Sequence, residues 1–176
     1  MLLVAAALAL PAEARLLLTR EEGIARVFGD SARTTTATIY LDRAALDSLA
    51  ARARAPMSQG RVTYYIVHTG DTLAGLAFVD RHVVRTASET VLIALDPSGA
   101  VRAVEILAWN EPEDYLPSER WLKTAKGVRD AAAVRPGNAV PRIAGATLSG
   151  QSMTAAIRRA LILGERILSS MRRTPR

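Results

Sequence analysis

Four short apolar strands separated by tight turns, all within residues 60–110, constrain the fold of this chain most strongly. Branched and aromatic residues recur there, and Thr69-Gly70-Asp71 and Asp96-Pro97-Ser98-Gly99 have turn composition. The strands are expected at residues 61–68, 73–79, 89–95 and 101–109, and the polar segment 80–86 predicts an irregular connection. Strands joined by such short turns form an antiparallel meander, here half-buried with apolar residues on one face.

Helical patterns flank these strands on both sides. Thr19 and Glu22 have the spacing of a capping box, and apolar residues after Gly150 recur at helical spacing. The expected elements are a helix over 19–28, a strand over 33–41, a helix over 42–54, a linker over 56–60, a short helix over 118–126 and a long helix over 150–171. The sequence therefore predicts an α+β fold, an antiparallel sheet covered by helices with a long C-terminal helix.

The first fourteen residues are typical of an export signal. Leu2–Leu10 is an apolar run too short to span a bilayer, and Ala12-Glu13-Ala14 after Pro11 fits a cleavage site. A positively charged segment does not precede the run, so two alternatives stay open: a start further upstream, which would allow a membrane anchor, or a buried segment. We expect a signal peptide over 1–14, a lead-in over 15–59, the main domain over 60–171 and a basic tail over 172–176. The protein is therefore expected to be exported, to the periplasm or to the extracytoplasmic face of a membrane.

Composition excludes several kinds of chemistry. The 176 residues include no cysteine, which excludes disulfides, Cys-ligated metals and a thiol nucleophile, and two histidines are too few for a His-rich metal site. The net charge is +6, but the arginines are scattered and not interleaved with aromatic residues. No nucleic-acid partner is expected, and no catalytic or metal-binding residue is predicted.

A small-residue turn before the last helix is the strongest candidate for a binding site. Gly145 and Ala146 leave room for a bulky group, and Thr147 adds a hydroxyl where a helix N-terminus favours phosphate. A phosphate ester on Thr147 would attach a nucleotide cofactor covalently. The alternative is a plain turn threonine, with Ser149 as the N-cap of the helix.

The segment Ile143-Ala144-Gly145-Ala146-Thr147-Leu148-Ser149 resembles the flavinylation motif of the FMN-binding domain family. This family includes the C subunit of the sodium-translocating NADH:quinone reductase and the G subunit of the Rnf complex. The resemblance covers roughly residues 60–168, including the Glu-Pro loop at Glu111, and is closest to a single-domain exported subgroup. It departs from the motif at Pro141, where the family often has Asp, and at Ala144, where it has Ser.

The resemblance implies FMN bound covalently through a phosphoester to Thr147, attached by a separate flavin transferase. The cofactor-binding residues that follow from the motif are Gly145, Ala146, Leu148 and Ser149. Glu111 is expected near the flavin by its family position.

Four other side chains are placed near the flavin, each against a structural alternative. Hydrogen-bond donors at the flavin edge would come from His82 and Arg85, for which an ion pair with Asp80 or Glu89 is the favoured alternative. Tyr115 suits ring packing and core packing equally. A core role is favoured for Trp121.

An exported electron-transfer flavoprotein with membrane electron-transfer partners is therefore the predicted function. The alternatives are an unflavinylated relative that binds flavin noncovalently or serves a structural role, and a flavin reductase. The sequence contains no G-x-G-x-x-G nicotinamide fingerprint, which disfavours the reductase.

Overall fold

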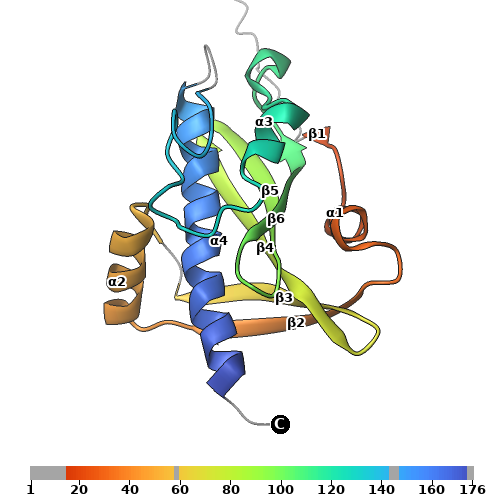
Figure 1. Ribbon diagram of the computed structural model, residues 1–176. Coiled ribbons are helices and arrows are strands. Elements are labelled where there is room, and N and C mark those ends of the chain that lie inside the picture. The colour runs from red at the N-terminus through yellow and green to blue at the C-terminus, as the bar shows by residue number, and fades with distance from the viewer. Residues whose placement is uncertain (1–14, 58–59, 143–146, 174–176) are drawn as a thin grey trace, which may run out of the picture.

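A six-stranded antiparallel sheet organises the computed structural model, which describes residues 15–57, 60–142 and 147–173 (Figure 1). The strands lie in the order β1-β6-β5-β4-β3-β2, so five consecutive strands form a meander and β1 adds to its far edge. Their bounds are β1 Arg15–Leu16, β2 Arg33–Tyr40, β3 Arg61–Thr69, β4 Thr72–Val84, β5 Ala87–Leu95 and β6 Val101–Trp109. The predicted α+β meander with a long C-terminal helix is confirmed.

The helices begin where side-chain caps satisfy their first backbone N–H groups. The hydroxyl of Thr19 accepts a hydrogen bond from the Glu22 amide at 3.2 Å, and the Glu22 carboxylate accepts one from the Thr19 amide at 2.7 Å. The side chains of Asp42 and Ser118 cap the second and third helices by each accepting one hydrogen bond, from the amides of Ala45 and Trp121. The helices are α1 Arg20–Phe28, α2 Arg43–Ala53, α3 Glu119–Thr124 and α4 Thr147–Arg173, with a 3-10 turn, η1, at Glu113–Tyr115.

The predicted irregular connection over residues 80–86 is wrong. β4 continues to Val84, and a two-residue turn joins it directly to β5, whose Ala87 pairs with Val84. Arg85 takes the left-handed conformation that the turn requires, with φ of 54°. This hairpin was not predictable from local sequence signals for two reasons. An arginine stands at a turn position where a glycine is usual, and the polar residues of β4, which are paired inside the protein, have the composition of a loop.

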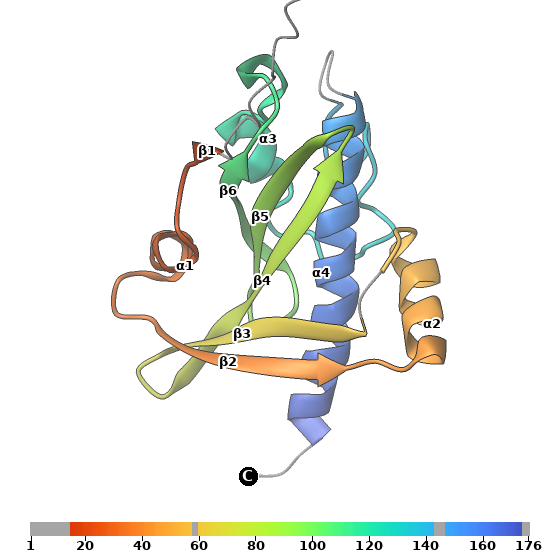
Figure 2. The ribbon, with the colours of Figure 1, turned by 180° about the vertical axis from the view of Figure 1, so that it is seen from behind.

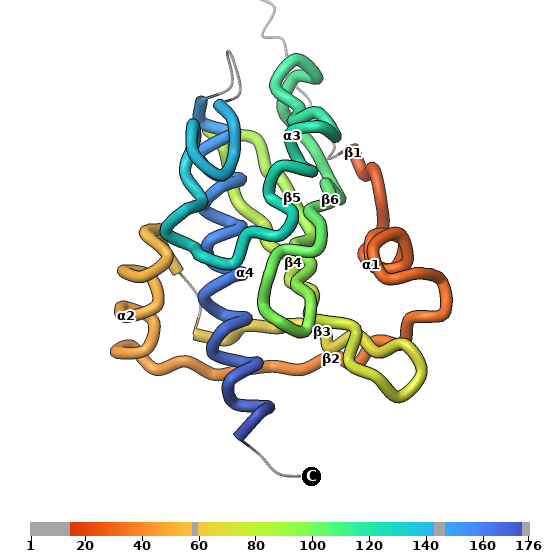
Figure 3. Tube along the Cα trace, in the orientation of Figure 1, coloured from red at the N-terminus to blue at the C-terminus, as the bar shows by residue number. Residues whose placement is uncertain are grey.

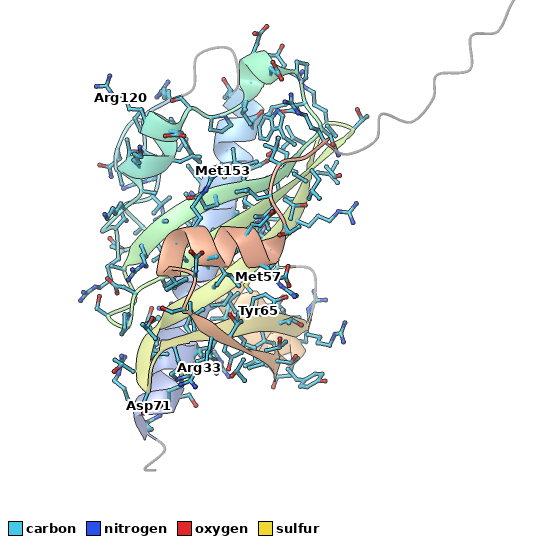
Figure 4. The ribbon with its side chains drawn as sticks, turned by 90° about the vertical axis from the view of Figure 1, so that its right-hand side faces the viewer. Arg33, Met57, Tyr65, Asp71, Arg120 and Met153 are labelled. Carbon is cyan, nitrogen blue, oxygen red and sulfur yellow. The ribbon has the colours of Figure 1, made fainter. Side chains whose placement is uncertain are left out.

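Helices cover both faces of the central strands. The long helix α4 runs along one face, where its apolar residues pack on β4 and β5 (Figure 1). On the other face Ile24 and Phe28 of α1 contact a second apolar cluster that includes Tyr65 and Leu92, and Figure 4 shows Tyr65 beside α1. The expectation of one half-buried face therefore fails for β5, which α1 and α4 bury from both sides.

The sheet is strongly bent, because β2 and β3 run across the direction of the upper parts of β4, β5 and β6 (Figure 2). β4 follows both directions, and Gly75 lies in it with φ of 153°. A Cβ atom at Gly75 would lie 2.0 Å from the carbonyl oxygen of Leu95. A Cβ at Gly164 of α4 would lie 2.2 Å from the Leu95 side chain. These two glycines therefore allow the tight approach of β4 to β5 and of α4 to the sheet.

The connection between α3 and α4 runs against the outer side of α4 before it returns towards the start of that helix (Figure 3). Val134 and Val140 are fully buried there, and Arg158 of α4 donates a hydrogen bond to the Val134 carbonyl at 3.2 Å. The helices in residues 15–57, 60–142 and 147–173 include none that is long and apolar enough to cross a membrane.

Candidate functional site

The motif threonine stands at the beginning of the longest helix. α4 starts at Thr147, three residues earlier than expected, and both Thr147 and Leu148 are exposed. Gly145 and Ala146, which complete the predicted phosphate turn, lie outside the described residues. The Thr147 hydroxyl is thus borne on the first turn of a helix, where the peptide dipoles favour negative charge.

Ser149 is not the N-cap of this helix. It is the third residue of α4, it is buried, and its hydroxyl donates a hydrogen bond to the Glu111 carboxylate. The helix begins earlier than the apolar pattern indicated, so the serine points inward to the Glu-Pro loop. The structure thereby brings together Glu111 and the motif, two parts of the predicted site that are far apart in the sequence.

His82 is the centre of a buried ionic cluster on the α4 face of the sheet. Its Nδ1 lies 3.0 Å from Asp80 Oδ1, and its Nε2 lies 3.0 Å from Glu89 Oε2. Glu89 is the β5 residue that pairs with His82 of β4. Arg159 of α4 closes the other side through two hydrogen bonds of 2.7 Å to Asp80. The expected ion pairing of His82 is confirmed, with both carboxylates rather than one.

These contacts set the charge states of the cluster. Burial opposes ionisation of Asp80, but hydrogen bonds from His82 and Arg159 outweigh it and lower its pKa to about 2. Burial also opposes the charge on His82, yet its bonds to Asp80 and Glu89 raise its pKa to about 9. His82 is therefore an imidazolium at neutral pH, and both of its ring nitrogens are donors.

Sequence analysis did not predict Glu89 as a site residue. It named Glu89 only as a possible ion-pair partner of His82 and Arg85. The Glu89 side chain is fully buried, and burial followed by the nearby Glu111 carboxylate raises its pKa against the opposing effect of His82. The signal that could have found it is a glutamate near the start of a mostly apolar strand, at the position paired with His82 of β4. Through Glu89 the cluster reaches Glu111 and, by way of Ser149, the first turn of α4.

Arg85 and Tyr115 form a separate pair near the same end of the sheet. The Arg85 guanidinium lies over the Tyr115 ring at 5.9 Å from its centroid. The alternative of an ion pair between Arg85 and Asp80 or Glu89 is not the arrangement observed. Trp121 is buried, and its indole donates to the Pro141 carbonyl at 2.7 Å, so the favoured core role for this residue is confirmed.

Two open grooves of similar size differ in their relation to these residues. A groove of about 600 Å³ lies along β6 between α1 and α3 and is lined by none of the predicted site residues. A second, of about 570 Å³, lies between β3, β4 and α4, where Asp80, His82 and Arg159 form part of its wall. The second groove has the volume of a small-molecule site.

Comparison with known proteins shows which family and which fold the chain resembles. Residues 87–162, which include β5, β6 and the first part of α4, match the FMN-binding domain family. The predicted resemblance to this family is thereby confirmed over this segment. No curated protein matches the chain.

One solved structure with a similar fold is that of NqrC from Shewanella oneidensis. Its crystal structure superposes with a TM-score of 0.58 over 87% of this chain and 89% of that chain, at 14% sequence identity. At this identity the similarity establishes a shared fold.

Proposed function

We propose that this protein is an electron carrier that holds FMN covalently through a phosphoester to Thr147. The observation that carries the proposal is the exposed hydroxyl of Thr147 at the first residue of α4, in the position of the acceptor threonine in the resembled motif. The match of residues 87–162 to the FMN-binding domain family supports the same cofactor.

The residues around Thr147 fit a phosphate ester. An acceptor hydroxyl must be reachable by the modifying enzyme, and Thr147 is exposed. The helix N-terminus stabilises the added negative charge, and the bond from Ser149 to Glu111 fixes the turn that bears the threonine. FMN would supply the redox chemistry, while the chain would supply attachment, orientation and local charge.

The second groove and the Arg85–Tyr115 pair are the surfaces that we assign to the flavin ring. The groove borders the imidazolium of His82 and the guanidinium of Arg159, although Asp80 already neutralises much of that charge. Tyr115 offers a half-buried aromatic face. The Arg85 guanidinium over this face would favour the reduced, anionic form of the cofactor.

The expected partners and location complete the proposal. A flavin transferase would attach FMN, and membrane electron-transfer proteins would reduce and oxidise it. The protein would work outside the cytoplasm, as the export signal expected over residues 1–14 implies. A tether has particular value there, because it keeps the cofactor bound when free FMN is scarce.

Coexpression of the full chain with a flavin transferase tests the covalent bond. The wild type and Thr147→Ser, which retains a hydroxyl, should show a fluorescent band after denaturing electrophoresis and an intact mass higher by one FMN. Thr147→Val, which is nearly isosteric but has no hydroxyl, should show neither. An unmodified wild type, beside a control acceptor that the same transferase does modify, would refute the proposal.

Pro141 and Ala144 favour one alternative, a relative that binds flavin without a covalent bond. In that case the native protein retains flavin through gel filtration, and denaturation releases all of it. The Thr147→Val variant then binds as much flavin as the wild type, which separates the two functions.

A further inference from the structure

Glu89 is buried with one carboxylate oxygen lacking a hydrogen-bond donor. Its Oε2 faces the imidazolium of His82, but its Oε1 has no hydrogen-bond partner among the residues that the structure describes. A fully buried carboxylate oxygen without a donor is costly, because it has lost water and gained nothing in exchange. The atom requires either a donor or a proton of its own.

The carboxyl group of Glu111, which interacts with the Glu89 side chain and raises its pKa, can resolve this deficit. Two facing carboxylates repel each other, but one proton between them converts the repulsion into an O–H to oxygen hydrogen bond. Glu111 already accepts a hydrogen bond from Ser149 and lies by the N-terminus of α4, both of which stabilise its charge. The proton is therefore better placed on Glu89.

The charges of the surrounding groups also indicate that the two glutamates share one proton. Asp80 and the two glutamates would carry three negative charges, against two positive charges on His82 of β4 and Arg159 of α4. One proton makes this cluster neutral, and a neutral cluster has the lowest cost of burial. The other polar contact nearby, from the Asn110 amide to the Ser88 hydroxyl at 3.0 Å, adds no charge.

We propose that Glu89 and Glu111 form a binding site for a single proton, held on Glu89 Oε1 and donated to the Glu111 carboxylate, and that this site is coupled through Ser149 to the charge on residue 147. Glu89 keeps its proton at neutral pH and loses it to water when the pH is raised far enough. A negative group attached at Thr147 makes the proton on Glu89 harder to remove, because it adds to the negative charge that the proton partly neutralises. The coupling gains its significance from the proposed function, in which residue 147 bears a phosphate, but it requires no flavin to be tested.

Infrared spectroscopy of the full chain detects the proton directly. The wild type should show the C=O stretch of one protonated carboxylic acid at neutral pH, which disappears reversibly as the pH is raised. Glu89→Gln and Glu111→Gln should each abolish the band, because a single carboxylate facing a neutral amide and His82 has no second negative charge to offset. Glu165→Gln, which removes an exposed carboxylate on α4, is the matched control and should leave it unchanged.

The coupling is tested by changing the charge at position 147 without any cofactor. Thr147→Glu should raise the pH at which the band is lost, because the added negative charge acts on the proton across Ser149 and Glu111. Thr147→Gln has the same shape without the charge and should not move it.

Each result decides the proposal. Absence of the band in the wild type at neutral pH, or its persistence in either glutamine variant, would overturn it. If Glu89→Gln does not fold, the wild type and Glu111→Gln are sufficient for this decision. Equal titration in the Glu and Gln variants of Thr147 would remove the coupling. Because none of these measurements uses flavin, the result is independent of whether Thr147 is flavinylated.

Discussion

His82 should make the stability of this protein depend on pH in a defined direction. Burial lowers the affinity of the imidazole for a proton, but the contacts with Asp80 and Glu89 outweigh it and raise the pKa from 6.5 to about 9. A group whose pKa is higher in the folded chain stabilises the fold fully below its unfolded pKa. We therefore expect the full contribution below pH 6.5 and its loss as the pH rises through 9.

The size of the effect follows from the same pKa values. Each pH unit of difference corresponds to about 1.4 kcal/mol, so the rise to about 9 corresponds to about 3 kcal/mol in the free energy of unfolding. The side chain of His82 is 11% exposed, so solvent screens this interaction little. The contribution is large beside the total stability of a typical domain, which is about 5–15 kcal/mol.

Urea unfolding of the wild type and His82→Gln at a series of pH values measures this contribution. The difference in unfolding free energy between the two should be largest near about pH 6 and should shrink by about 3 kcal/mol by about pH 9.5. His68→Gln is the matched control, since His68 and His82 are the only histidines in the sequence. In nitrogen-detected NMR, the imidazole signal that His82→Gln removes should titrate near pH 9. A constant stability difference, or a His82 midpoint at or below 6.5, would refute this reasoning.

Three substitutions test the packing and the charges that hold the site. Gly75→Ala should cost about 3 kcal/mol or more, because the new Cβ meets the Leu95 carbonyl oxygen at 2.0 Å and the backbone cannot yield; calorimetry of the purified variant measures the loss. Gly164→Ala should cost about 1–2 kcal/mol in urea unfolding, because the clash with the movable Leu95 side chain is partly offset by the higher helix propensity of alanine. Asp80→Asn should cost about 3–5 kcal/mol at neutral pH by leaving Arg159 without its buried counter-charge, and in the wild type this stabilisation should persist above pH 3.8 and disappear as the pH falls through 2.

The strands and helices were predictable where local chemistry decided them. The caps at Thr19, Asp42 and Ser118 place three helix starts, and the Asp96–Gly99 turn separates two strands at the expected positions. These signals act over a few residues, so the sequence alone contains them. The burial of β5 on both faces was harder to predict from the sequence, because it depends on the packing of α1, which comes from a distant part of the chain.

The site was predictable as a motif but not as a cluster. Thr147 was found from the small-residue turn before the last helix, and Ser149 and Glu111 were placed at the site through a resemblance. Their juxtaposition depends on where that helix begins. The ionic residues of β4 misled the interpretation instead, since Asp80 and His82 resembled the polar composition of a loop. Only the register that sets His82 opposite Glu89 explains why a strand tolerates them.

The α4 face of β4 changes character along its length, and this change argues that the ionic cluster serves the site. Leu76 and Phe78 are buried apolar residues, whereas the next positions on the same face are Asp80 and His82. Buried ion pairs seldom stabilise a fold more than apolar residues of similar volume, so stability alone would have continued the apolar pattern to the end of the strand. The charged end is also the end that reaches Ser149 through Glu89 and Glu111. We infer that the cluster is retained to control charge and protonation beneath Thr147, and that replacing Asp80, His82 and Arg159 together by apolar residues would preserve the fold while changing the titration of Glu89.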